Sequence, residues 1–207
     1  MGNITITPST PIILASASKI RYEILNKTGL EFSVIVSDVN EEELKKKIIN
    51  KSIKERAIIL ASEKAYNVSA SHPYSYVIGA DQICNLNDKI YSKPNNMDNA
   101  IKQLKELSGK THKQTSGISL YFNGKIIWSY VEEAELTMNE LTDNEIIKYL
   151  KTDKPFNSCG SYRYESLGIH LFCKVTGHNE TIQGLPIIGL LKQLRKNKVY
   201  SITNIKA

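Results

Sequence analysis

Asp81 is the acidic residue with the most distinctive neighbours in this sequence. It follows the β-favouring pair Val77-Ile78 and the two small residues Gly79 and Ala80. Valine and isoleucine favour a buried strand, and small residues let another group approach the backbone closely. We therefore expect Asp81 to emerge where a strand ends, which is the edge at which α/β sheets bind ligands. An aspartate that only begins a turn is the alternative interpretation of this short motif.

Positive charge stands at the start of a helix predicted from Lys19 to Thr28. Ser18 is a suitable N-cap for this helix. Arg21 falls in the first turn, where the helix dipole is already positive, and this costs ~0.3–1 kcal/mol unless it is compensated. An anion held by free backbone N–H groups and by the hydroxyls of Ser16 and Ser18 would compensate it. A solvated Arg21 that points away is the open alternative.

Two lysines farther along the chain have unusual surroundings. The capping box of Ser52 and Glu55 begins a helix with an apolar stripe, and Lys64 falls in the middle of that stripe. A lysine there must reach to water along its stem or pair with an anion. Lys93 precedes Pro94, which favours an extended backbone and gives the lysine a fixed direction.

Carboxylates gather after a second strand, predicted from Leu30 to Val36. Glu42 and Glu43 suit the first turn of a helix, where the dipole favours negative charge. Asp38 and Glu41 remain candidates either for that role or for holding a divalent cation, which prefers oxygen ligands.

The composition of the chain limits its partners and its compartment. It has 207 residues, of which 41% are hydrophobic, and a formal net charge of +6. This balance suits an anionic partner, either a nucleic acid or a small phosphate compound. No apolar run is long enough to cross a bilayer, and residues 1–11 lack the pattern of a signal peptide. Three cysteines without metal-like spacing argue against a disulfide framework and favour a reducing cytosol.

Local signals predict the remaining elements that must position these residues. They are a hairpin joining Ile83–Leu86 to Lys89–Tyr91, a longer hairpin around Asn123-Gly124, a helix capped by Thr142 and Glu145, a strand from Ile169 to Val175, and a last helix opened by Pro186.

These separated segments together resemble the Maf family of nucleoside triphosphate pyrophosphatases. They occur in the family's order and cover the chain from about Ile12 to the last helix. The matching segments are Leu14-Ala15-Ser16-Ala17-Ser18 with Arg21, Glu41, Ala61-Ser62-Glu63-Lys64-Ala65, Gly79-Ala80-Asp81-Gln82, Ser92-Lys93-Pro94, Leu107-Ser108-Gly109-Lys110-Thr111-His112, Cys159-Gly160-Ser161 and Gly184-Leu185-Pro186.

The resemblance implies an α/β fold with a mixed twisted sheet, flanking helices and two lobes around a cleft, similar to the inosine triphosphatase-like fold. It implies a single domain over residues 1–207, with an N-terminal extension at 1–10. The implied reaction splits a nucleoside triphosphate into a monophosphate and pyrophosphate, with a divalent cation, Mg²⁺ or Mn²⁺, as cofactor. The resemblance also implies a homodimer. The composition described above predicts a cytoplasmic protein without a membrane partner, and the lack of basic runs interleaved with aromatic residues argues against a nucleic-acid partner.

The family positions fall on the residues already selected by their chemistry. Arg21, Lys64 and Lys93 match positions that hold phosphates, beside the two serine hydroxyls. Glu41 and Asp81 match metal-site positions, and Asp81 also matches the proton acceptor. Asn40 departs from the family's usual aspartate, which reduces the number of carboxylates in the site.

Three further positions sort substrates within the family. They correspond to Ile20, Gln82 and Glu165, and the branch that acts on dTTP and UTP has Arg, Thr and Gln there. Gln82 and Glu165 instead resemble the branch that acts on 7-methyl-GTP, whereas Ile20 lacks that branch's aromatic side chain. The sequence thus predicts 7-methyl-GTP as substrate. The alternatives are a dTTP/UTP pyrophosphatase and a non-catalytic nucleic-acid-binding or cell-division protein.

Overall fold

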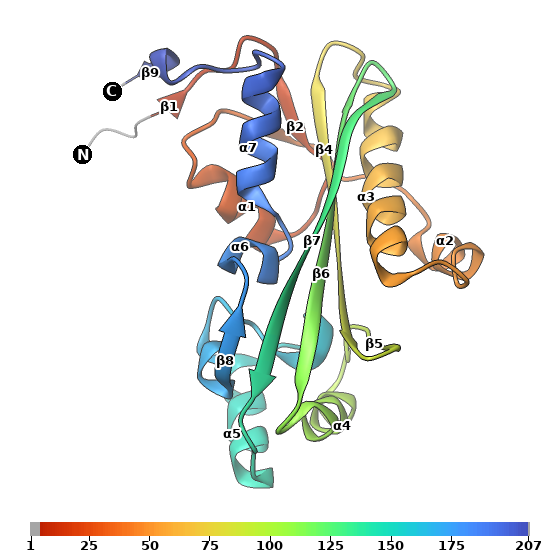
Figure 1. The fold of residues 1–207 in the computed structure, drawn as a ribbon, viewed down its shortest axis with the longest axis vertical. Helices are drawn as coiled ribbons and strands as arrows, with labels where there is room; N and C mark the ends of the chain where they lie inside the picture. The colour runs from red at the N-terminus through yellow and green to blue at the C-terminus, as the bar shows by residue number, and fades with distance from the viewer. Residues whose placement is uncertain (1–4, 207) are drawn as a thin grey trace. The chain divides into compact units, whose positions relative to one another are not determined.

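The computed structural model describes residues 5–206 of the chain (Figure 1). Its elements are, in order, β1 (Thr5–Ile6), β2 (Ile12–Leu14), α1 (Lys19–Asn26), β3 (Ser33–Val34), α2 (Glu41–Lys47), α3 (Ile53–Ser69), β4 (Tyr76–Leu86), β5 (Lys89–Tyr91), α4 (Met97–Leu107), β6 (Thr111–Phe122), β7 (Lys125–Met138), α5 (Asp143–Asp153), η1 (Cys159–Ser161), η2 (Leu167–Leu171), β8 (Phe172–Thr176), α6 (Asn179–Ile182), α7 (Ile187–Lys196), η3 (Ile202–Asn204) and β9 (Ile205–Lys206).

The main sheet is mixed, in the order β3-β2-β4-β6-β7-β8, with β5 paired to β4. Strand β2 runs parallel to β3 and β4, with Ile13 opposite Ser33 and Val77. Strands β5 and β8 pair antiparallel with β4 and β7. Strands β1 and β9 form a separate antiparallel pair. This mixed twisted sheet with flanking helices confirms the predicted α/β class.

The chain divides into two compact units, and β4, β6 and β7 contribute residues to both. Unit 1 contains residues 1–81, 116–132 and 184–207, and unit 2 contains residues 82–115 and 133–183. Within the described part of the chain, no helix has the length and apolar content that spanning a membrane requires.

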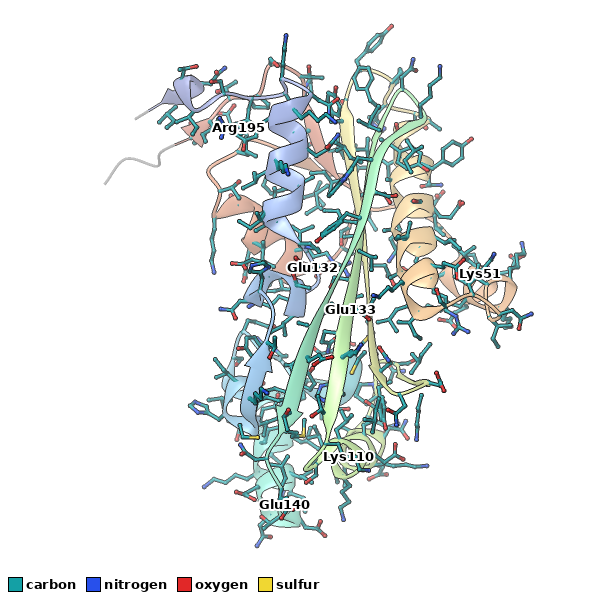
Figure 2. The ribbon with its side chains drawn as sticks, in the orientation of Figure 1. Lys51, Lys110, Glu132, Glu133, Glu140 and Arg195 are labelled. Carbon is teal, nitrogen blue, oxygen red and sulfur yellow. The ribbon has the colours of Figure 1, made fainter. Side chains whose placement is uncertain are left out.

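In unit 1, helices cover both faces of the strands. One core joins β2, β4 and β6 to α1 and α7 through side chains such as Leu14, Leu25, Ile78, Ile118 and Leu190. On the opposite face, α3 packs against β2 and β4 (Figure 1). Charged side chains such as Lys51, after α2, and Arg195, on α7, are exposed at the outside of the unit (Figure 2).

Gly79 allows the close approach of α3 to β4. A Cβ atom at Gly79 would lie 2.1 Å from the carbonyl oxygen of Ala61 and 2.7 Å from the nitrogen of Ala65. Both neighbours are helix backbone and cannot turn aside. Gly79 therefore serves helix packing inside a continuous strand.

In unit 2, the core lies among α4, α5 and the strands. It includes Leu104, Leu136, Leu150 and Tyr162. Polar groups are buried beside it: the hydroxyl of Tyr162 is 2.8 Å from His112 Nε2 and accepts from Gln114 Nε2 at 2.7 Å.

Several local predictions are confirmed. The capping boxes at Ser52 and Thr142 both form, and β6 and β7 flank Asn123-Gly124 as a hairpin. The capping boxes and the Asn123-Gly124 turn are predictable from sequence because neighbouring residues alone satisfy or orient the backbone groups there.

Two strand predictions are too long. Of the segment predicted from residue 30 to 36, only Ser33–Val34 forms a strand, next to the three-residue strand β2, and Leu30 makes an isolated bridge with Ile6. The strand predicted from Ile169 begins at Phe172, because Gly168 turns tightly against Arg163 and the segment up to Leu171 forms η2.

We predict that Gly79→Ala destabilises the protein by at least about 2 kcal/mol, because the added methyl forces α3 away from β4. Gly189→Ala, in helix α7, is the matched control: its Cβ would meet only side-chain atoms of Trp128 and Tyr130, at 3.3 Å or more. Urea unfolding should place the control within about 1 kcal/mol of wild type. Equal stabilities of the two variants would contradict the packing argument.

His112 makes stability depend on pH. Burial lowers its pKa from 6.5 to about 4, and its Nδ1 is buried without a hydrogen-bond partner among the described residues. Between pH 6.5 and pH 4, His112 binds a proton in the unfolded chain but not in the folded chain, so the free energy of unfolding falls as the pH falls toward 4. The loss should reach about 3 kcal/mol. Urea unfolding of His112→Gln should lack this part of the slope, whereas the exposed-site control His170→Gln should keep it. An unchanged slope in His112→Gln would refute the assignment.

Candidate active site

A buried lysine between two carboxylates forms the centre of the candidate site in unit 1. The Nζ atom of Lys64 lies 2.7 Å from Asp81 Oδ1 and 3.0 Å from Glu41 Oε1. The side chains of Lys64 and Asp81 are only 9% and 11% exposed, and that of Glu41 is 39% exposed. The lysine on the apolar stripe of α3 therefore has the anionic partners that its position requires.

Three elements bring these side chains together. Alternation along β4 places Asp81 on the same face as Val77 and Gly79, which face α3. Lys64 lies on the side of α3 that packs against this face. Glu41 is the first residue of α2, which begins at the N-cap Asn40, whose side chain accepts from the N–H of Glu43 at 3.1 Å.

The structure corrects the expected position of Asp81. It lies in the middle of the eleven-residue strand β4 and not where a strand ends. The sequence prediction failed because Gly79 and Ala80 have low β propensity, and the helix α3, whose close packing requires Gly79, is not a neighbour in sequence. The carboxylate reaches the site from the face of the sheet.

Lys45 is a second cation that the sequence analysis did not select. It lies one helical turn after Glu41 on α2, at 3.7 Å from Glu41 Oε2. Burial would lower its pKa, but its hydrogen bond to Glu42 and the charges of Glu41, Glu42 and Asp81 outweigh this and raise the pKa. The i, i+4 spacing from Glu41 was the available signal.

The loop between β2 and α1 forms a second polar group in unit 1. Ser16 is buried, and its Oγ accepts from the N–H of Ser18 at 3.2 Å. Ser18 caps α1 through the N–H of Arg21 at 3.4 Å. The Arg21 side chain turns back onto this loop: its Nη1 donates to Ser16 Oγ at 3.4 Å, and its Nε donates to the carbonyl of Gly184 at 2.8 Å. Arg21 therefore does not point away into solvent.

The neighbours of Arg21 play other parts. Lys19 is exposed and 3.6 Å from Glu23, as expected of a solvated residue. Ile20 packs against the core of unit 1.

Asp38 and Glu41 are the two carboxylates whose role the sequence left undecided. Asp38 is exposed, and its main-chain N–H donates to Asn67 Oδ1 at 3.3 Å. Of these two carboxylates, only Glu41 contacts Lys64.

The carboxylate oxygens around Lys64, from Asp81 and Glu41, fit a hard divalent cation. Oxygens of Asp81 and Glu41 already converge on one positive charge, and Mg²⁺ is commonly held by one or two carboxylates together with substrate phosphates. Among residues 5–206 there is no group of three or more His, Cys, Asp or Glu side chains placed to hold a metal alone.

Unit 2 carries the other predicted residues. Lys93 is exposed in the loop between β5 and α4, which is tied down by Asn99 Nδ2 donating to the carbonyl of Pro94 at 3.0 Å. Gln82 donates its amide to the carbonyls of Thr181, at 3.5 Å, and Ile182 in α6. Both partners are carbonyls, so the amide nitrogen must face them, and Oε1 is left as an acceptor.

Glu165 lies in the loop that follows α5. Its Oε1 is 3.4 Å from Nε of Arg163, and its side chain is 27% exposed. Sequence reasoning selected Glu165 and missed Arg163, which also contacts Asp153, ten residues earlier in the chain.

Comparisons with known proteins agree on one family. The profile of the Maf-like protein family matches residues 11–197. A protein of Legionella pneumophila (strain Paris) named nucleoside triphosphate pyrophosphatase is 43% identical over 93% of this chain and 96% of its own. A protein of Brucella abortus named 7-methyl-GTP pyrophosphatase is 38% identical over 90% and 96%.

Among solved structures, a HAM1 protein from Coxiella burnetii aligns over 91% of this chain and 98% of its own, with 12% identity and a TM-score of 0.42. The family assignment rests on the sequence matches, which span nearly the whole chain in the order of the motifs described above. The chain belongs to the Maf family.

Proposed function

We propose that this protein hydrolyses a nucleoside triphosphate to the monophosphate and pyrophosphate. The observation that carries the proposal is the buried Lys64 between Asp81 and Glu41, three residues that match the family's phosphate and metal positions. A buried ion pair that serves only stability is replaceable by apolar side chains. A cation and two carboxylates that meet at one point suit a polyphosphate and its counter-ion.

The residues of unit 1 divide the chemistry. Water attacks the α-phosphorus, a new P–O bond forms, and the bond to the β-phosphate oxygen breaks. Asp81 accepts the proton of the attacking water. Lys64, Arg21 and the serine hydroxyls offset the negative charge of the phosphates and of the leaving pyrophosphate. Lys93 of unit 2 stays a predicted phosphate contact.

Glu41 and Asp81 would hold the divalent cation, Mg²⁺ or Mn²⁺. When bound, such an ion lowers the pKa of a coordinated water and polarises the phosphate. The cytoplasmic location expected from the cysteine usage and the homodimer implied by the family resemblance stay predictions; sedimentation of the purified protein tests the homodimer.

For the base, we propose guanine and, more narrowly, 7-methylguanine. Gln82 offers Oε1 and Glu165 offers carboxylate oxygens, so both present hydrogen-bond acceptors. Guanine has two adjacent donor groups on its Watson–Crick edge, whereas thymine and uracil have one donor between two acceptors. Methylation at N7 adds positive charge that a carboxylate favours. The name of the Brucella abortus relative agrees with this choice.

We predict that Asp81→Asn lowers kcat by about 10²–10⁴-fold, because the near-isosteric amide cannot accept the proton. The Tm should stay close to that of wild type, since Lys64 keeps Glu41 as partner. Glu31→Gln removes an exposed carboxylate of the same unit and is the matched control. Steady-state kinetics with Mg²⁺ and thermal unfolding test this; near-normal kcat in folded Asp81→Asn would end the assignment.

We also predict that 7-methyl-GTP and GTP are hydrolysed with kcat/KM at least about tenfold above UTP and dTTP. Glu165→Gln should reduce this ratio because it replaces an acceptor by a group that can donate. Chromatography of the products over a nucleotide panel with Mg²⁺ or Mn²⁺ is the measurement. Preference for UTP or dTTP would favour the alternative substrate class. Failure to hydrolyse any nucleotide would overturn the enzymatic proposal and favour a binding protein.

A further inference from the structure

We propose that Arg163, anchored by Asp153, is a positioning residue that fixes the carboxylate of Glu165 and thereby sets the preference for the base. The inference rests on the proposed function, in which Glu165 reads the base. It concerns residues of unit 2 only.

Arg163 holds two carboxylates at once. Its Nη1 is 3.6 Å from Asp153 Oδ1 and donates to the Asp153 carbonyl at 3.4 Å. Its Nε donates to Glu165 Oε1 at 3.4 Å. The Asp153 side chain is only 4% exposed, whereas those of Arg163 and Glu165 are 43% and 27% exposed. The guanidinium thus joins a buried carboxylate to an accessible one.

Asp153 is a firm anchor. It ends α5, and its two carboxylate oxygens accept from Tyr149 Oη at 2.8 Å and Ser166 Oγ at 2.7 Å. Burial, together with the neighbouring Asp153, raises the pKa of Tyr149, so its hydroxyl keeps its proton and donates. A buried carboxylate with three polar partners holds the arginine in one place.

The backbone between Arg163 and Glu165 is also fixed. The N–H of Arg163 donates to Tyr149 Oη at 3.0 Å. Its carbonyl accepts from the N–H groups of Ser166 and Gly168, both at 3.1 Å. A Cβ atom at Gly168 would lie 2.3 Å from that carbonyl oxygen, so the turn closes only with glycine. Glu165 therefore stands on a short closed loop.

A fixed arginine decides what position 165 offers to a ligand. With Oε1 engaged by Arg163, the second oxygen of the glutamate is presented as an acceptor. In Glu165→Gln, the same arginine would hold the amide carbonyl and turn the NH₂ group outward as a donor. A donor suits the carbonyls of uracil and thymine. The effect of the Glu165 change should therefore depend on Arg163.

The test is a double-mutant cycle read as the ratio of kcat/KM for GTP to that for UTP. Arg163→Met should lower the ratio about tenfold through KM for GTP, with kcat nearly unchanged. Arg163→Lys should restore part of it. In the Glu165→Gln background, Arg163→Met should move the ratio in the opposite direction, toward GTP, because the amide is no longer held. A structural role alone would not reverse the sign.

Two further variants keep the test sharp. Lys105→Met breaks an exposed ion pair of the same unit, with Asp143 at 2.8 Å, and should leave the ratio unchanged. In Arg163→Met alone, the buried carboxylate of Asp153 loses its cationic partner, which could prevent folding. Combining Arg163→Met with Asp153→Asn removes that buried charge, so the ratio can be measured on a folded protein. Two outcomes would overturn the positioning role while the enzymatic function stands, provided that all variants still release pyrophosphate. One is a GTP-to-UTP ratio that Arg163→Met does not change. The other is additivity of the effects of Arg163→Met and Glu165→Gln on the logarithm of that ratio. Loss of pyrophosphate release in wild type would instead remove the function itself.

Discussion

The burial of Lys64 is the constraint on which unit 1 depends. An ammonium group removed from water requires negative partners at short distance, and Asp81 and Glu41 supply them at 2.7 and 3.0 Å. Close contact of α3 with β4 is possible because Gly79 has no side chain. The start of α2 then brings Glu41 to the same point. Packing and charge therefore agree on one arrangement, and that arrangement concentrates the groups that a polyphosphate and a divalent cation require.

In unit 2, too, a buried charge is satisfied by partners at short distance, and here the contacts orient Glu165. The buried carboxylate of Asp153 is satisfied by Tyr149, Ser166 and Arg163, and the arginine extends the network to Glu165. Gln82 is oriented by main-chain carbonyls of α6. In each unit, buried polar contacts fix the direction of a side chain that remains accessible. Such preorganisation lowers the cost of ordering when a ligand binds.

The sequence predicted features that depend on nearby residues. Capping boxes and the Asn123-Gly124 hairpin are local, and helical periodicity placed Lys64 on the buried side of α3 without knowledge of its partners. It failed where the reason lay elsewhere in the chain. Asp81 was expected at a strand end because the α3 contact that requires Gly79 is not visible locally. Arg163 was missed because its anchor lies ten residues earlier, on the last turn of a helix, and no periodicity connects them.

We propose that the groups of unit 1 direct water to the α-phosphorus of a nucleoside triphosphate. Hydrolysis of GTP in ¹⁸O-labelled water, followed by mass spectrometry of both products, tests this most directly. Attack at the α-phosphorus should leave one ¹⁸O atom in the monophosphate and none in the pyrophosphate. Label in the pyrophosphate, or release of a nucleoside diphosphate and inorganic phosphate, would contradict attack at the α-phosphorus.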